Sequence, residues 1–358
     1  MFYREAGQYK TSYAADMAIF PLRQDRIGLA IILAVAFVGI PLLGTRFFLD
    51  VVMIPLLVYA LASIGLNLLV GYTGLLSLGT GGFMGVGAFA CYKLTTWFPD
   101  ISLLIWLPVS GLFAAAVGAL FGLPSLRIKG FYLVVATLAS QFFLQWCFSR
   151  IGWLTNYNVS GSIEVPQRTV LGVPITGAHA TSLTRYYVVL CVVALVTLIA
   201  SNLVHGRIGR AWMAVRDMDI AAELIGIRLM PAKLLAFTVS SYVCGVAGAL
   251  MVFLWYGSAE PDVFSIDLSF LILFMVIIGG LGSLIGNFMG AALIQVLPVL
   301  LRAVTITLGA PIASSTVEHL TFIIVGTLII VFLIAEPLGL ASLWQTAKQK
   351  LRVWPFPY

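Results

Sequence analysis

The chain contains very little charge. Only 9% of its 358 residues are Asp, Glu, Lys or Arg, whereas 61% are hydrophobic. Water-soluble globular domains have roughly 25% charged residues, so this composition excludes an ordinary soluble domain. It is typical of a protein whose chain lies mostly inside a lipid bilayer.

Cysteine is scarce as well. The four cysteines lie singly inside apolar stretches and show no paired spacing: Cys91, Cys147, Cys191 and Cys244. Disulfide frameworks and cysteine-ligated metal sites both need cysteines at defined spacings. We therefore expect neither a disulfide nor a metal site, and we interpret these residues as packing residues.

Ionisable residues are almost missing from the apolar stretches. Lys93 lies near one end of such a stretch, and Asp50, Asp267 and Glu336 lie at boundaries. Proton-coupled carriers need buried acids or histidine relays, which the pattern does not provide. The chain also has no nucleotide-binding motif. Energy for any active transport would thus come from a sodium site built of carbonyls or from a partner ATPase.

Long apolar runs recur along the sequence, and a bilayer-spanning helix needs about 20 such residues. The runs are continuous and do not alternate apolar with polar residues, which predicts helices and excludes a transmembrane barrel. The fold class expected is all-α, a polytopic membrane bundle of about ten spans. The expected spans are Ile27–Gly44, Leu49–Val70, Leu75–Trp97, Leu103–Leu123, Phe131–Ile151, Tyr186–Val204, Leu234–Tyr256, Leu268–Gly280, Leu284–Leu301 and Leu320–Ala335.

The basic residues lie between the expected spans and predict the orientation. Most of them fall in residues 1–26, Pro124–Gly130, His205–Lys233 and 341–358, which ten spans place on one side. The positive-inside rule makes that side the cytoplasm, so both termini are expected there, flanking a transmembrane domain of residues 27–340. The same positions argue against nucleic acid as the reason for the net charge of +6. The opposite side would carry the polar loop Gly152–Thr184, either a flexible connector or a functional loop.

Two glycine-rich segments are candidates for the translocation pathway. Gly71–Gly87 reads GYTGLLSLGTGGFMGVG, and GGLGS follows the shortest expected span, where a helix can break. Close packing of helices is the alternative interpretation of these glycines. A weak internal sequence similarity relates GLLSL, which begins at Gly74, to GLGSL, which begins at Gly280. The candidate pathway residues are Thr73, Ser77, Thr80, Gly81, Gly82, Gln141, Gly279, Gly280 and Ser283.

The segment His205–Lys233 is a polar stretch between two long apolar runs, and it carries five of the chain's 20 Lys and Arg residues. It predicts a short helix over Ile220–Gly226, with Asp219 as its N-terminal cap and Gly226 at its stop. An exposed helix with small alanines and both charge signs is suited to docking in a groove of a soluble partner. The candidate coupling residues are Arg216, Asp217, Asp219, Ala221, Ala222, Glu223 and Gly226.

These segments carry a family resemblance. GRAWMAVRDMDIAAELIGIRLMPAK, with GLLSLGTGGFMGVGAFA, GLPSLRIKGFYLVVATLA, GGLGSLIGNFMGAALIQVLP and EPLGLASLW in this order, resembles bacterial ABC importer permeases of the branched-chain amino acid (LivM-type) family. The resemblance implies a non-enzymatic inner-membrane subunit working by alternating access. It implies as partners a second similar permease, two cytoplasmic ATPases that bind ATP-Mg, and a periplasmic solute-binding protein. This chain itself would hold no cofactor.

The resemblance specifies the family and leaves the solute open among leucine-like amino acids, other amino acids, amides and urea. The rival interpretation is a passive channel or facilitator for a small polar solute such as urea or an amide, with the glycine-rich segments forming its pore. A receptor or scaffold is a third class, but the outside segments are small for recognising a ligand alone. Association with an ATPase separates the first interpretation from the others.

Overall fold

The structure is a computed structural model that describes residues 12, 23–125, 132–158, 161–170, 172–177, 180–307, 314–335 and 339–353. Most of the N-terminal segment, the 126–131 loop and Glu336 contributed to the topology prediction and lie outside the described residues.

Helices make up nearly all of the described chain. They are α2 Arg23–Ala34, η1 Val35–Gly39, α3 Ile40–Leu43, η2 Phe48–Met53, α4 Ile54–Thr73, α5 Thr80–Trp97, α6 Leu103–Ser125, α7 Tyr132–Arg150, α8 Ser182–His205, α9 Arg207–Asp217, α10 Asp219–Leu224, α11 Leu229–Leu250, η3 Met251–Tyr256, η4 Pro261–Phe264, α12 Ile266–Gly279, α13 Leu284–Thr307, α14 Ser314–Ala335 and α15 Gly339–Val353. Four two-residue strands form two small antiparallel pairs: β1 Ile163–Glu164 with β4 Ser258–Ala259, and β2 Thr169–Val170 with β3 Val173–Pro174.

Each of the ten expected apolar runs coincides with a helix. Among the described residues, seven helices are long and apolar enough to cross a membrane by length and composition. Shorter apolar helical segments lie at Ile266–Gly279 and Ile323–Phe332. The predicted all-α, multi-pass membrane fold is confirmed.

The centre of the bundle is formed by α4 and α11. Every residue of α4 except Leu56 is buried, and α11 packs against α4, α5 and α6. Glycines allow this packing: a Cβ on Gly87 of α5 would lie 2.1 Å from the carbonyl oxygen of Gly245 in α11. Part of the glycine-rich segment therefore serves close helix contact.

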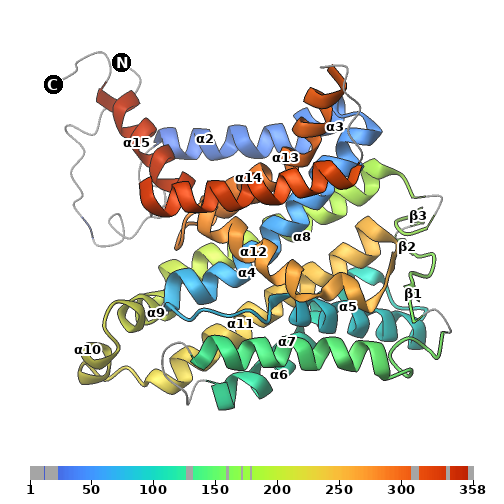
Figure 1. The fold of residues 1–358 in the computed structure, drawn as a ribbon, viewed down its shortest axis with the longest axis horizontal. Coiled ribbons are helices and arrows are strands. Elements are labelled where there is room, and N and C mark those ends of the chain that lie inside the picture. Colours follow the sequence, from blue (N-terminus) through green and yellow to red (C-terminus); the bar gives the residue numbers. More distant parts are fainter. Residues whose placement is uncertain are drawn as a thin grey trace.

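The long helices run roughly parallel to one axis of the molecule (Figure 1). At one end of this axis lie α9, α10 and α15, whereas β1, β2 and β3 lie at the opposite end (Figure 1). The segment His205–Lys233 and the Gly152–Thr184 loop therefore lie at opposite ends of the bundle. That these ends face opposite sides of the membrane stays a prediction.

Two of the expected spans have different bounds in the structure. Leu75–Trp97 was expected to be helical throughout, but α5 begins only at Thr80, after a non-helical stretch Gly74–Gly79. Gly74 has φ +70° and closes α4 through hydrogen bonds from Gly74 N–H to Val70 O and from Leu75 N–H to Leu69 O. The short run ends as α12 at Gly279, and Gly280, with φ +114°, separates α12 from α13. Both α4 and α12 stop at a glycine whose backbone conformation other residues rarely adopt.

Candidate coupling site and helix breaks

The polar segment between α8 and α11 folds into two short helices. Trp212 of α9 is fully buried and donates its Nε1–H to Ala232 O at 3.0 Å, which ties α9 to the start of α11. The chain then turns at Met218 and continues as α10 at the outer end of the bundle (Figure 1). The predicted short helix is present, at Asp219–Leu224 and not at Ile220–Gly226.

Two details of the predicted helix are wrong. Its N-cap is Met218, and no side chain caps it; Asp219 lies in the first turn with its carboxylate 3.9 Å from Lys233 Nζ. Ala222 is buried and does not face a partner, whereas Ala221 and Glu223 are exposed. Gly226 follows the helix with φ +91°, as a stop residue should.

The exposed surface of α10 is dominated by large apolar side chains. Met218 is 70% exposed, Ile220 74%, Leu224 84% and Ile225 74%. These four residues are here named the α10 apolar patch. Exposed charges flank it at Asp217 and Glu223. An apolar patch beside charged groups at the polar end of a membrane protein is typical of an interaction site.

Arg216 turns toward the bundle and not toward the α10 apolar patch. It donates from Nη1 to Gly71 O of α4 at 2.8 Å and from Nε to Asp217 Oδ1 at 3.0 Å. Gly71 O lies in the last turn of α4, where carbonyls have no partner within the helix. Leu75 N–H, the ordinary partner of that carbonyl, is bonded to Leu69 O. Arg216 thus supplies the missing donor, and its positive charge suits a helix C-terminus.

A buried amide pair holds α4 against the break between α12 and α13. Asn67 Nδ2 donates to Asn287 Oδ1 and to Ser283 O, each at 3.1 Å, and Asn67 Oδ1 accepts from Gly282 N–H at 2.9 Å. Asn67 and Asn287 are both fully buried. Ser283 Oγ in turn accepts from Gly286 N–H at the start of α13. The backbone of the break is therefore fixed by one side chain of α4.

The N-terminus of α5 is held by a second buried polar cluster. Gly82 N–H donates to Gln141 Oε1 at 2.5 Å, and Gly81 N–H donates to Ser269 Oγ at 2.8 Å. Gln141 Nε2 also donates to Phe264 O at 2.7 Å, and Leu78 N–H donates to Thr137 Oγ1 at 3.1 Å. Because the first N–H groups of a helix have no partner within it, these side chains act as tertiary caps.

The structure divides the predicted pathway residues into two groups. Thr80, Gly81, Gly82 and Gln141 meet at the start of α5, whereas Thr73, Gly279, Gly280 and Ser283 lie at the ends of α4, α12 and α13; Ser77 lies in the stretch that joins α4 to α5. All but Ser283 are buried. Their role in translocation stays a prediction.

Sequence reasoning missed Asn67, Asn287 and Ser269. All three are polar residues inside apolar helices, and each forms a hydrogen bond between distant helices. The sequence did contain a signal for them, because a polar side chain inside a membrane helix needs a hydrogen-bond partner. The sequence could not show which helix would supply it.

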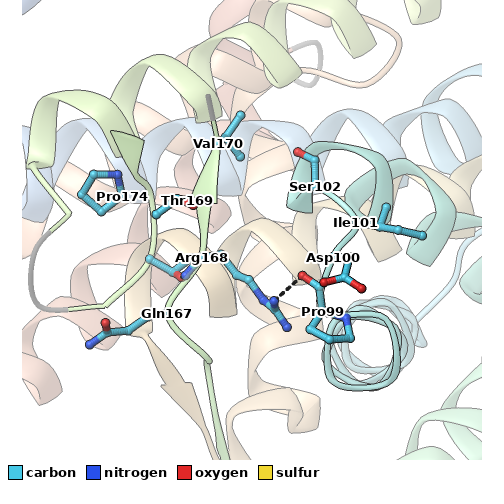
Figure 2. A pocket seen from close by; sticks show the side chains of 10 residues that line it. Pro99, Asp100, Ile101, Ser102, Gln167, Arg168, Thr169, Val170 and Pro174 are labelled. Atoms are coloured by element: carbon cyan, nitrogen blue, oxygen red, sulfur yellow. Dashed lines mark hydrogen bonds between the residues drawn. The ribbon is translucent and has the colours of Figure 1, made fainter. Parts of the chain in front are cut away.

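At the opposite end, the Gly152–Thr184 loop is tied to the bundle. Arg168 donates to Pro99 O at 2.6 Å and to Thr95 O at the end of α5, while Asn156 accepts from Lys93 Nζ. The Lys93 side chain is thus buried against the loop and held by a protein contact. Figure 2 shows the surface pocket of about 650 Å³ that this loop forms with residues 99–102, including the bond from Arg168 to Pro99.

These features define a class: a multi-pass helical membrane protein with glycine turns after α4 and between α12 and α13, and with an exposed apolar patch on α10. The family described as "Branched-chain amino acid transport system / permease component" matches residues 48–333. The chain therefore belongs to this family, as the resemblance implied.

Known relatives agree with the family. The chain is 29% identical over 333 residues to the high-affinity branched-chain amino acid transport system permease protein LivM of Escherichia coli, covering 87% of this chain and 73% of the relative. It is 24% identical over 243 residues to a probable branched-chain amino acid transport permease protein LivM of Methanocaldococcus jannaschii, covering 66% of this chain and 68% of that relative. No solved structure matches the chain significantly.

Proposed function

We propose that this chain is the transmembrane permease subunit of an ATP-driven importer that moves branched-chain or related amino acids across the bacterial inner membrane by alternating access. A second similar permease and two cytoplasmic ATPases that bind ATP-Mg would complete the transporter. A periplasmic solute-binding protein would deliver the solute at the end that carries the Gly152–Thr184 loop. The amino acid class rests on the family and on the names of its relatives.

The α10 apolar patch is the observation that carries this proposal. Leu224 and Ile220 are both more than two-thirds exposed, although they lie at an end of the bundle rich in charged residues. Covering one such side chain contributes about 1.5–3 kcal/mol. A groove on a soluble protein would bury several of them at once, and the flanking charges would fix its orientation.

The ionisable residues of the chain bear on what energy source drives transport. Among the Asp, Glu, Lys, Arg and His side chains that the structure describes, Lys93 is the buried one, and it is engaged by Asn156 and by the ring of Trp153. A group held in this way is poorly suited to carry protons between the two sides. Of the two sources left, a sodium site built of carbonyls and a partner ATPase, we infer nucleotide hydrolysis by the docked partner, since docking at α10 would let it drive the bundle.

The test is association with an ATPase. The chain would be co-expressed with its candidate ATPase subunits, purified in mild detergent and assayed for co-purification. Leu224→Ser combined with Ile220→Ser should weaken association about 100-fold, since two apolar side chains lose their burial. Ile208→Ser is the matched control, because Ile208 is also exposed but lies on α9 outside the patch.

Transport in sealed vesicles completes the test. With the assembled complex, leucine uptake should require internal ATP and persist when an uncoupler removes the proton gradient or when sodium is omitted. Uptake by the chain alone, without ATP, would support the channel interpretation and refute the importer.

A further inference from the structure

Arg216 lies where the end of α4 approaches the turn between α12 and α13. Its Nη1 donates to Gly71 O of α4. The same Nη1 lies 3.5 Å from the position that a Cβ on Gly282 would take, in the break between α12 and α13. Its Cγ lies 3.2 Å from the corresponding position on Gly74, where α4 ends. One side chain therefore touches both glycine breaks.

The two breaks are also in direct contact. A Cβ on Gly71 would lie 2.3 Å from Gly282 N and 1.9 Å from Asn67 Oδ1, so no atom larger than hydrogen fits between α4 and the break. Gly282 has φ +77° and donates its N–H to Asn67. A displacement of the end of α4 must therefore move Gly282 as well, since close-packed backbone transmits displacement.

The breaks correspond in sequence as well as in space. GLLSL begins at Gly74 and GLGSL begins at Gly280, and each joins a pair of helices, α4 with α5 and α12 with α13. Non-helical backbone inside a membrane bundle, such as the stretch Gly74–Gly79, is expected where a transport protein changes conformation or lines its pathway. The two similar segments, GLLSL and GLGSL, therefore both lie beside Arg216.

The geometry points to Arg216 as the positioning residue that transmits movement of α10 to the two helix breaks. The inference rests on the proposed function, because it assumes that a partner moves α10. Only Asp217 and Met218 separate Arg216 from α10, while Trp212 anchors the rest of α9. A pull on α10 thus acts first on the Arg216 end of α9 and, through the bond to Gly71 O, on α4 and Gly282.

Arginine suits this task better than lysine. Its guanidinium bonds Asp217 through Nε and Gly71 O through Nη1 at the same time. A lysine ammonium can reach only one of these in a fixed direction, because it has a single flexible point of charge. A glutamine would keep similar length without the positive charge at the end of α4.

The experiment compares Arg216→Gln, Arg216→Lys and the control Arg210→Gln in the assembled complex with its ATPases. Arg210 is an exposed arginine of the same helix. Co-purification, ATP hydrolysis and leucine uptake would be measured in the same vesicles. In Arg216→Gln we expect normal co-purification and a ratio of uptake to hydrolysis about tenfold lower, since one charge-assisted hydrogen bond is lost. Arg216→Lys should recover part of this ratio, and Arg210→Gln should keep it.

Hydrogen exchange of residues 280–286 gives a second measurement, in the presence and absence of a non-hydrolysable ATP analogue. The analogue should change exchange there in the wild type and not in Arg216→Gln. An unchanged ratio of uptake to hydrolysis in Arg216→Gln would overturn the inference. Loss of ATPase co-purification in this variant would also overturn it, because Arg216 would then be a docking residue. If Arg216→Gln does not fold, the wild type alone decides: no effect of the analogue on exchange at residues 280–286 would overturn the inference.

If no ATPase co-purifies with the wild-type chain, the proposed function fails, and the inference fails because it rests on that function.

Discussion

Asn67 of α4 and Asn287 of α13 are joined by a hydrogen bond from Nδ2 to Oδ1 of 3.1 Å, and both side chains are fully buried. They are separated by 220 positions in the chain. Together with the bonds from Asn67 to the backbone of Gly282 and Ser283, this pair fixes the break between α12 and α13.

Asn67→Leu should destabilise the bundle. The change leaves Gly282 N–H, Ser283 O and the fully buried Asn287 amide without their partner. Unpaired buried groups of this kind cost about 1–3 kcal/mol. Thermal unfolding in detergent should show a lower midpoint, whereas Asn202→Leu, at an exposed position of α8, should unfold like the wild type. Equal midpoints for the two variants would contradict the role assigned to Asn67.

Gln141→Leu should lower stability more than it alters affinity for solute. Gln141 caps Gly82 N–H of α5 and donates to Phe264 O, so its removal leaves these two backbone groups unpaired in an apolar environment. The measurement is the unfolding midpoint together with KM for leucine uptake. Gln145→Leu, one turn further along the same helix, is the control. A large rise in KM at an unchanged midpoint would instead make Gln141 a pathway residue.

Gly226 should tolerate asparagine better than valine. Its φ of +91° is costly for side-chain residues, although a Cβ there would meet nothing within 4 Å. Strain and not collision therefore decides the outcome. Gly226→Val should cost about 1–2 kcal/mol locally and displace α10, lowering leucine uptake, while Gly226→Asn should retain most of it because Asn adopts this conformation more readily. Similar uptake in both variants would show that the turn does not position α10.

Labelling should distinguish the two ends of the bundle. In a background with serine at all four native cysteine positions, Val173→Cys should react with an impermeant thiol reagent in intact cells, and Met218→Cys should react only after permeabilisation. Val173 is 47% exposed and Met218 is 70% exposed, so access to both depends on the side of the membrane. The reverse pattern would invert the proposed orientation and exclude α10 from contact with a cytoplasmic ATPase.

The helices and their approximate bounds could be predicted from the sequence because bilayer thickness imposes a length and an apolar composition on each span. The turn after Gly279 and the polar segment His205–Lys233 could be predicted for the same reason, because both interrupt the succession of long apolar runs. The five residues before Thr80 were assigned to a helix wrongly. Their apolar composition also suits an extended stretch buried in protein, and the two cannot be told apart by composition alone.

What the sequence by itself determined is thus the membrane class, the order of the helices and the presence of a short helix in the polar segment His205–Lys233. Only the tertiary structure decided that Ala222 turns inward while Leu224 and Ile220 face outward, and that Arg216 bonds α4. The physical reason is that burial and polar pairing inside a bundle depend on which helices become neighbours. Asn67, Gln141 and Arg216 each need a partner, and distant parts of the chain supply it.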